Sequence, residues 1–402
     1  MSTTTLKAPA PAKGLDPNTQ QLVQNLNAGW TNYISTQMGL DKGSFQLAQG
    51  TLGLQTADDS GLFLMQDAVP ALSSIGYYDS SSMKKRSGAY GMLINAALLA
   101  ESNIQSFISA MGAYYNDWCN YKKATPPTAG QTPMAYFKQY ELQSNMGPNP
   151  QAEAAYNDML NSPLGTAQAN YTNMAYQEQF TQGMQQFYLP VYSGTAAGAQ
   201  LAIAGGGSLK NILFDSTTAD TSSNSFFANG SASGFYSIFS GDASVDFSSL
   251  NTKAASSQFT ITGYINSFAT LSCGAGGWYT SAEVSRAFNA PNDFTVWNKL
   301  SSAGTWDSFF GQPNGSLARY VSQLILVSDY QLTVTSKATY SQEDYQQIKT
   351  KASFGIWPFF SASGGSTQTS DVTQNADSTI SVTHTLPKGL IQIWGANVLP
   401  QS

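Results

Sequence analysis

Ionisable side chains are scarce in this chain of 402 residues. Only 10% of the residues are charged, whereas soluble domains average about 25%. There is one histidine, His384, and the 18 basic and 24 acidic residues give a formal net charge of −6. This balance excludes a basic nucleic-acid surface, because phosphate binding depends on clustered lysine and arginine side chains.

Cysteine is also rare, and the two residues present, Cys119 and Cys273, cannot form a disulfide framework. We expect both to be buried free thiols. The sequence contains neither the CxxC spacing of structural zinc sites nor an HExxH motif. The glycine-rich run 204–210 lacks the GxxxxGK[ST] spacing of a phosphate-binding loop and indicates a hinge instead. We therefore expect no metal and no cofactor.

Proton-transferring groups are too few and too scattered to predict an active site. His384 would be the only base for a Ser-His-Asp or Cys-His arrangement. It alternates with Ile380 and Val382 on one face of a predicted strand, which indicates a buried structural histidine. The carboxylates available for glycosidic hydrolysis are the pairs Asp58–Asp59 and Glu343–Asp344 and the trio Glu283, Asp293 and Asp307. Helix capping or a solvated turn explains each of them, so we predict no catalytic residue and a protein that is not an enzyme.

Long apolar runs are missing as well. Residues 1–15 predict a flexible arm without the apolar core of a secretory signal. Nowhere do 18 consecutive apolar residues suggest a membrane-spanning helix. The abundant serine, threonine and aromatic residues are nevertheless typical of extracellular, coat or toxin proteins. The compartment is therefore unknown from the sequence, and we expect any export to use a route other than the general secretory pathway.

The first half of the chain, residues 16–189, predicts a helical bundle domain. Asp16 and Pro17 give an N-cap and a first helical residue, and Gly39 ends that helix. Apolar residues at three- and four-residue spacing predict further helices. These cover residues 57–72, 82–99, 102–123, 132–146, 150–160 and 166–188.

The second half, residues 190–402, predicts a β domain rich in glycine, serine and threonine. Short runs of β-branched and aromatic residues between glycines indicate strands joined by turns. The strands are predicted at 258–270, 324–336, 378–386 and 390–398, with one helix near 293–310. The fold class that follows is α+β: an N-terminal helical bundle followed by a mainly antiparallel, sandwich-like β domain.

The most unusual segment of the chain is an aromatic heptad at residues 354–360. It contains Phe354, Ile356, Trp357, Phe359 and Phe360, and a long polar run separates it from the alternating strand 380–386. Residues 351–386 therefore form a candidate amphipathic hairpin with a polar tip. In a β-pore-forming protein, such a hairpin would turn one face to lipid and the other to water. The five apolar residues are our candidates for contact with a membrane or partner, although Pro358 disfavours a regular strand.

Composition and pattern together favour a non-catalytic, toxin-like protein that acts at surfaces through a membrane-inserting or pore-forming hairpin. Its expected partners are a membrane surface or identical subunits in a homo-oligomer, and not nucleic acid. One alternative is a self-assembling structural protein of a coat, filament or injection system, in which the hairpin adds a strand to a neighbour. Another alternative is a carbohydrate-active protein that uses paired carboxylates or exposed aromatic residues.

Overall fold

The computed structural model describes most of the chain in two compact units. The sheet unit comprises Met1–Met83, Gly194–Gly274 and Tyr320–Leu399, and the helical unit comprises Lys84–Ser193, Ala275–Arg319 and Pro400–Ser402. Within them the structure describes residues 17–54, 59–70, 85–99, 102–128, 130–182, 184–222, 250, 253–254, 256–291, 305–311, 315–351, 362–363 and 369–402. The predicted arm, residues 1–15, lies outside these ranges. One unit boundary, after Ser193, lies close to the compositional change that the sequence shows near residue 190.

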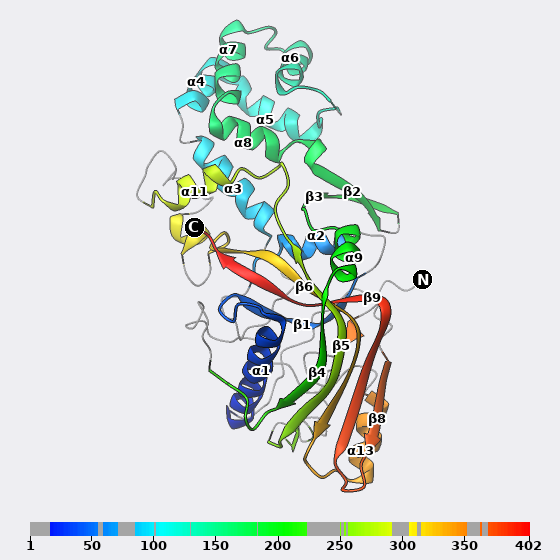
Figure 1. The fold of residues 1–402 in the computed structure, drawn as a ribbon. Coiled ribbons are helices and arrows are strands. Elements are labelled where there is room, and N and C mark those ends of the chain that lie inside the picture. The colour runs from blue at the N-terminus through cyan, green and yellow to red at the C-terminus, as the bar shows by residue number, and fades with distance from the viewer. Residues whose placement is uncertain are drawn as a thin grey trace. The chain divides into compact units, whose positions relative to one another are not determined.

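The fold class is α+β, as predicted, with most helices in the N-terminal half and most strands in the C-terminal half (Figure 1). The helices are α1 (Pro17–Met38), α2 (Ser60–Asp67), α3 (Arg86–Leu99), α4 (Ser102–Met111), α5 (Tyr114–Ala124), α6 (Pro133–Gln143), α7 (Pro150–Leu160), α8 (Pro163–Tyr171), α9 (Ala196–Ala204), α11 (Ser281–Phe288), α12 (Trp306–Phe310) and α13 (Gln342–Lys351), and a 3₁₀ turn spans Met174–Tyr176. The strands are β1 (Phe45–Gly53), β2 (Gln177–Gln182), β3 (Gln185–Pro190), β4 (Gly207–Asp215), β5 (Phe259–Ser272), β6 (Arg319–Ser336), β7 (Ala362–Ser363), β8 (Thr369–Gln374) and β9 (Ile380–Pro400).

The helical unit begins three of its helices in the same way. Thr132, Asn149 and Ser162 cap α6, α7 and α8, and each side chain accepts a hydrogen bond from a backbone N–H of the first turn. A proline follows each cap, where its missing N–H costs nothing. Aromatic side chains pack α5 against α6 and α7: the rings of Trp118 and Phe137 meet edge to face with their centroids 5.3 Å apart, and Trp118 also contacts Tyr156.

Two helix predictions for the first half of the chain are wrong in detail, and one strand was not predicted. The helix predicted over 166–188 ends at Tyr171, and β2 and β3 form an antiparallel hairpin in which Phe180 lies opposite Phe187. The helix predicted over 102–123 is two helices, separated at Gly112, whose φ of 53° lies in the left-handed region. Strand β1 was not predicted, and it pairs with the C-terminal strand β9.

The main sheet has seven strands, in the order β4-β5-β6-β9-β1-β7, with β8 also paired to β9. Apart from the parallel β1–β7 contact, the pairings for which the register is known are antiparallel. The predicted strands 258–270 and 324–336 correspond to β5 and β6 and are confirmed. Those predicted at 378–386 and 390–398 are parts of the single long strand β9.

Strands β5 and β6 switch the face on which their apolar residues lie without changing register. Ile265 pairs with Tyr330, and Phe268 pairs with Val327. All four side chains face the same core. In a regular strand, residues on one face are an even number of positions apart, but Ile265 and Phe268 are three apart, and so are Val327 and Tyr330. Between the two pairs, Asp329 has a φ of 51°. The two strands are therefore kinked together at this level, which we call the kink.

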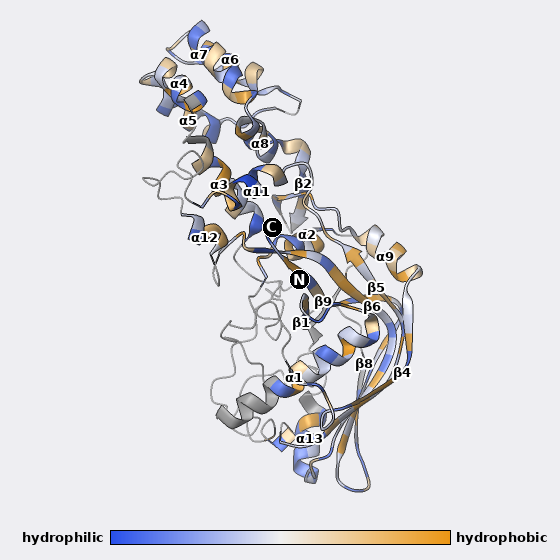
Figure 2. Cartoon of the chain, turned by 60° about the vertical axis from the view of Figure 1, so that its left-hand side comes forward, coloured by the Kyte–Doolittle hydropathy of each residue, from blue (hydrophilic) through white to orange (hydrophobic). Residues whose placement is uncertain are grey.

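Helices rather than a second sheet cover the faces of this sheet in the part of the chain that the structure describes. On the concave side, α1 packs Leu26, Trp30 and Ile34 against the strands (Figure 2). On the opposite face, α2 and α9 cover the half of the sheet beyond the kink, where Leu324, Leu326 and Ile393 are buried. The other half of that face, between the kink and Ser336, carries half-exposed threonine and serine side chains.

Candidate functional site

The end of the sheet that includes Asp215, Phe259, Ser336 and Ile380 is the place where the chain leaves and re-enters the strands. At this sheet end, residues 216–258 connect β4 to its neighbour β5, and residues 337–379 connect β6 to its neighbour β9. We call them the first and second connecting segments. They have the same length, and both join strands that are hydrogen-bonded to each other.

A charged contact links the two connecting segments. The ammonium group of Lys253, in the first segment, donates a hydrogen bond to Oδ2 of Asp344, in the second, at 2.9 Å. The same ammonium lies 5.0 Å from the centre of the Tyr340 ring, within range of a cation–π interaction. Asp344 belongs to the first turn of α13, where its carboxylate also accepts the N–H of Ser341 and the Ser341 hydroxyl accepts the N–H of Asp344. These reciprocal bonds form a capping box.

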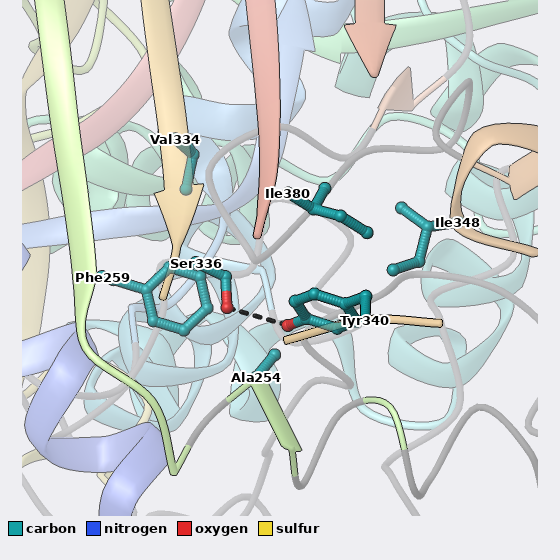
Figure 3. Close-up of a pocket in the computed structure, with 7 residues that line it drawn as sticks. All are labelled: Ala254, Phe259, Val334, Ser336, Tyr340, Ile348 and Ile380. Atoms are coloured by element: carbon teal, nitrogen blue, oxygen red, sulfur yellow. Dashed lines mark hydrogen bonds between the residues drawn. The ribbon is translucent and has the colours of Figure 1, made fainter. Parts of the chain in front are cut away.

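Hydroxyl groups extend this contact to the sheet. The Tyr340 hydroxyl lies 2.8 Å from the Ser336 hydroxyl (Figure 3). The Ser336 hydroxyl also lies 2.9 Å from the hydroxyl of Ser257. Apolar side chains of Ala254, Phe259, Val334, Ile348 and Ile380 surround the group and line a cavity of about 10 Å³. Such a cavity holds one water molecule at most. It is a packing defect at the junction of the segments rather than a ligand pocket.

The local environment fixes the charge states of this group. Partial burial of the Asp344 carboxyl opposes ionisation, but the hydrogen bonds from Lys253 and Ser341 outweigh it and hold the pKa below the ordinary value. Burial raises the pKa of Tyr340 to about 12. At neutral pH, Asp344 is therefore an anion that attracts Lys253, and the Tyr340 hydroxyl keeps its proton.

The five residues predicted to contact a membrane or partner, namely Phe354, Ile356, Trp357, Phe359 and Phe360, lie outside the described residues. Their position along the chain is nevertheless informative. They occupy the middle of the second connecting segment, as far along the sequence from β6 as from β9. The predicted hairpin 351–386 includes β8 and the first part of β9, which pair with each other in an antiparallel ladder from Thr369↔Thr385 to Gln374↔Ile380.

His384 is a buried structural residue, as its alternation with apolar neighbours predicted. Its side chain is fully buried on the concave face of β9, together with Val382 and Leu386. Burial lowers its pKa to about 3, so the imidazole is neutral at physiological pH.

The carboxylates singled out in the sequence have structural partners where they are described. Asp59 accepts a hydrogen bond from the N–H of Ala196, the first residue of α9, at 2.6 Å. Glu283 pairs with Arg286 at 2.8 Å within α11. The capping role expected of Asp344 is confirmed, and Asp307 lies in the first turn of α12. Asp58 and Asp293 lie outside the described residues.

A carboxyl pair that the sequence did not indicate joins α6 to α7. Burial raises the pKa of Glu141, the hydrogen bond from the N–H of Asn149 opposes this, and the carboxyl group of Glu153 raises it further. Glu153 in turn pairs with Lys138 at 2.9 Å. The backbone bond to Asn149 at the start of α7 and the ion pair indicate that these two glutamates hold helices together.

The remaining predicted features agree with a structural role. Cys119 and Cys273 are free thiols, although each is half-buried rather than buried. Gly206, in the glycine-rich run, lies between α9 and β4. It is so close to Phe268 that a Cβ atom on Gly206 would lie 2.3 Å from the carbonyl oxygen of Phe268. Trp278 is fully buried and therefore cannot be one of the exposed aromatic residues that a carbohydrate-binding surface needs. Among the described residues, no cluster of three or more His, Cys, Asp or Glu side chains could hold a metal ion.

The contacts of Lys253 with Asp344 and Tyr340 could not be found from the sequence. Lys253 and Asp344 are 91 residues apart, and no local pattern relates them. The nearest signal was Glu343–Asp344 after a serine, which indicates a helix start and gives no information about a partner across the fold.

Comparisons with protein-family models, with curated proteins and with solved structures found no match to this chain. None of the described helices has both the length and the hydropathy that a membrane span requires.

Proposed function

We propose that this protein inserts β-hairpins into membranes and forms pores as an oligomer. The observation that carries the proposal is the topology of the sheet end. Each connecting segment joins two hydrogen-bonded antiparallel strands at the same end of one sheet. Continuing β4 and β5 into the first segment, and β6 and β9 into the second, would extend ladders that already exist.

The lengths of the segments suit this change. A membrane-spanning strand takes about 9–11 residues, so a spanning hairpin takes about 20–25 residues with its turn. Residues 216–258 and 337–379 both exceed that length. The change would also require α13 to unfold and β8 to leave its present register with β9.

The composition of the segments points the same way. The first segment contains four charged residues, Asp220, Asp242, Asp246 and Lys253, among many serines and threonines. Because ionised side chains are costly in lipid, a segment with few of them is the least expensive to insert. The second segment carries more charge, and its charged residues lie toward its two ends, away from residues 352–370.

Apolar residues are concentrated at the middle of both segments. Phe235, Tyr236, Ile238 and Phe239 lie at the midpoint of the first segment, and the residues of 354–360 lie at the midpoint of the second. The midpoint of a hairpin is its far end, so both hairpins would present their aromatic residues farthest from the sheet. Tyrosine and tryptophan, here Tyr236 and Trp357, favour the membrane interface, because one end of each side chain is apolar and the other forms hydrogen bonds.

The proposal requires several copies of the chain. Four strands from one protomer cannot enclose a water-filled channel, since barrels with an aqueous lumen have about 16 or more strands. The expectation of a homo-oligomer is therefore part of the proposed function.

Release of an encapsulated dye from liposomes tests the proposal. We expect the wild type to release dye, and Trp357→Asp or Phe239→Asp to lower the rate about tenfold or more. The far end of each hairpin has to cross the bilayer centre during insertion, where a charge costs about 2.5–3.5 kcal/mol. Leu142→Asp is the matched control, since Leu142 is an exposed apolar residue of α6 outside both segments. Absence of release by the wild type from zwitterionic, anionic and sterol-containing liposomes alike would rule the proposal out.

A further inference from the structure

We infer that Lys253, Tyr340 and Asp344, with the hydroxyls of Ser257 and Ser336, form a latch that keeps the two connecting segments folded at the sheet end, and that the latch opens before membrane insertion. The second half of this inference rests on the proposed function, and the first half does not.

The latch is built from residues whose backbone conformation must change if the strands are to lengthen. Lys253 is close to the end of the first segment, and Asp344 lies in α13 of the second. Extension of β5 backwards through Lys253 and of β6 forwards through Asp344 would convert both residues into strand residues. The ion pair, whose side chains are 40% and 25% exposed, would then lose its present geometry.

The ends of the latch are fixed by the sheet itself. Ser336 is the last residue of β6 and pairs with Phe259, the first residue of β5. Its hydroxyl contacts Ser257 before β5 and Tyr340 after β6. The N–H of Tyr340 also donates to the carbonyl of Ser378, just before β9. The contacts of Ser336 and Tyr340 therefore bring together the beginning or end of three strands.

Tyr340 has a second role, which is to hold Lys253 in place. Its ring lies under the ammonium while its hydroxyl is bound to Ser336. The side-chain amide of Gln374 in β8 donates a hydrogen bond to the backbone carbonyl of Tyr340 at 2.8 Å. Release of Lys253 would therefore loosen the contacts that α13 and β8 make with the sheet end.

Local hydrogen exchange tests the latch in the absence of a membrane. Lys253→Met removes both the ion pair and the cation–π contact, so we expect amide exchange in α13 to become about fivefold faster. Asp344→Asn removes the ion pair but leaves an amide oxygen that can still accept the N–H of Ser341 and does not touch the cation–π contact, so it is expected to have a smaller effect. Lys253→Arg keeps a cation beside Asp344 and Tyr340 and leaves the capping bonds of Asp344 untouched, so we expect slower exchange than in Lys253→Met. Unchanged exchange in Lys253→Met would overturn the latch.

Dye release tests the second half of the inference. We expect Lys253→Met to release dye faster than the wild type by a similar factor, about fivefold. Lys138→Met is the matched control, because it breaks a partly exposed ion pair of the same length in the helical unit and should alter neither measurement. Release at the wild-type rate by a variant with faster exchange would overturn the opening step. If the wild type releases no dye at all, the proposed function fails, while the exchange experiment still decides whether the latch holds the segments.

Discussion

The two faces of the sheet between the kink and the sheet end differ in almost every respect. The concave face presents apolar side chains such as Leu332, Val334 and Val382, which are buried under α1 and its neighbours. The opposite face presents hydroxyls that bind one another across strands, with Thr333 paired to Thr383 and Thr335 to Ser381, both at 2.9 Å. Apolar packing stabilises the concave face. On the opposite face, the hydroxyl groups bind one another across neighbouring strands. The abundance of threonine in this half of the chain therefore belongs to a face that does not need a covering layer.

The largest loss of stability in this part of the sheet is expected from Gly263→Ala in β5, where both faces meet the same backbone. Gly263 has a φ of 144°, and a Cβ atom there would lie 2.0 Å from the carbonyl oxygen of Gln331. The substitution forces β5 away from β6 and disturbs both faces at once. We expect a loss of about 3 kcal/mol in the free energy of unfolding, measured by urea denaturation.

Thr262→Ala is the control for this change, because the neighbouring residue is exposed on the hydroxyl face and has no such clash. It should alter stability by less than about 0.5 kcal/mol. Equal midpoints for the two variants would contradict the account of Gly263.

An intermediate effect is expected from pH acting on the concave face. Because the pKa of His384 is lowered to about 3, the unfolded chain binds a proton below about pH 6.5 while the folded chain does not. Stability should therefore fall as pH decreases from about 6.5 toward 3, with a loss of about 2 kcal/mol at pH 5 relative to pH 8. Denaturation curves at both pH values measure this difference.

Replacement of the imidazole separates this effect from other titrations. In His384→Gln the loss between pH 8 and pH 5 should largely disappear, whatever the stability of the variant at pH 8. The carboxylates whose pKa is lowered, such as Asp215 and Asp377, titrate only at lower pH. A variant that keeps the full dependence would show that His384 is not its source.

The smallest effect is expected on the hydroxyl face. Removal of both partners by Thr333→Val with Thr383→Val leaves no unsatisfied hydroxyl, so the free energy of unfolding should change by less than about 0.5 kcal/mol. Leu332→Ala, one residue away on the buried face, should lower the free energy of unfolding by about 3 kcal/mol, and urea denaturation measures both variants. Similar losses in the free energy of unfolding for the two variants would show that the two faces contribute equally to stability, contrary to what their contacts indicate.

Patterns that depend on neighbouring residues could be predicted from the sequence, and those that depend on distant partners could not. The alternation of Ile380, Val382, His384 and Leu386 identified the buried face of β9, because each residue of a strand turns to the side opposite its neighbour. Strand β1 was missed, since its glycines weaken the pattern and its main partner, β9, is more than 300 residues away.

The hairpin β2–β3 shows how one spacing fits two structures. Phe180 and Phe187 are seven residues apart, which a helix places on one face and a hairpin with a short turn places directly opposite. Gly183, followed by one residue before the second run, was the available signal, because glycine is common at the first position of such turns. The candidate residues for membrane contact were predicted from composition, whereas the proposed latch depends on contacts between segments that are distant in sequence.

The kink has a practical consequence for anyone who scans this sheet by mutagenesis. In a regular strand, sensitivity to substitution follows every second residue. In β6, the sensitive positions on the concave face are odd up to Val327 and even from Tyr330 onward, and β5 undergoes the complementary shift between Ile265 and Phe268. A scan through either strand should therefore show a phase slip at Asp329 and Asn266, and a designer who shortens one strand by a residue there has to shorten both.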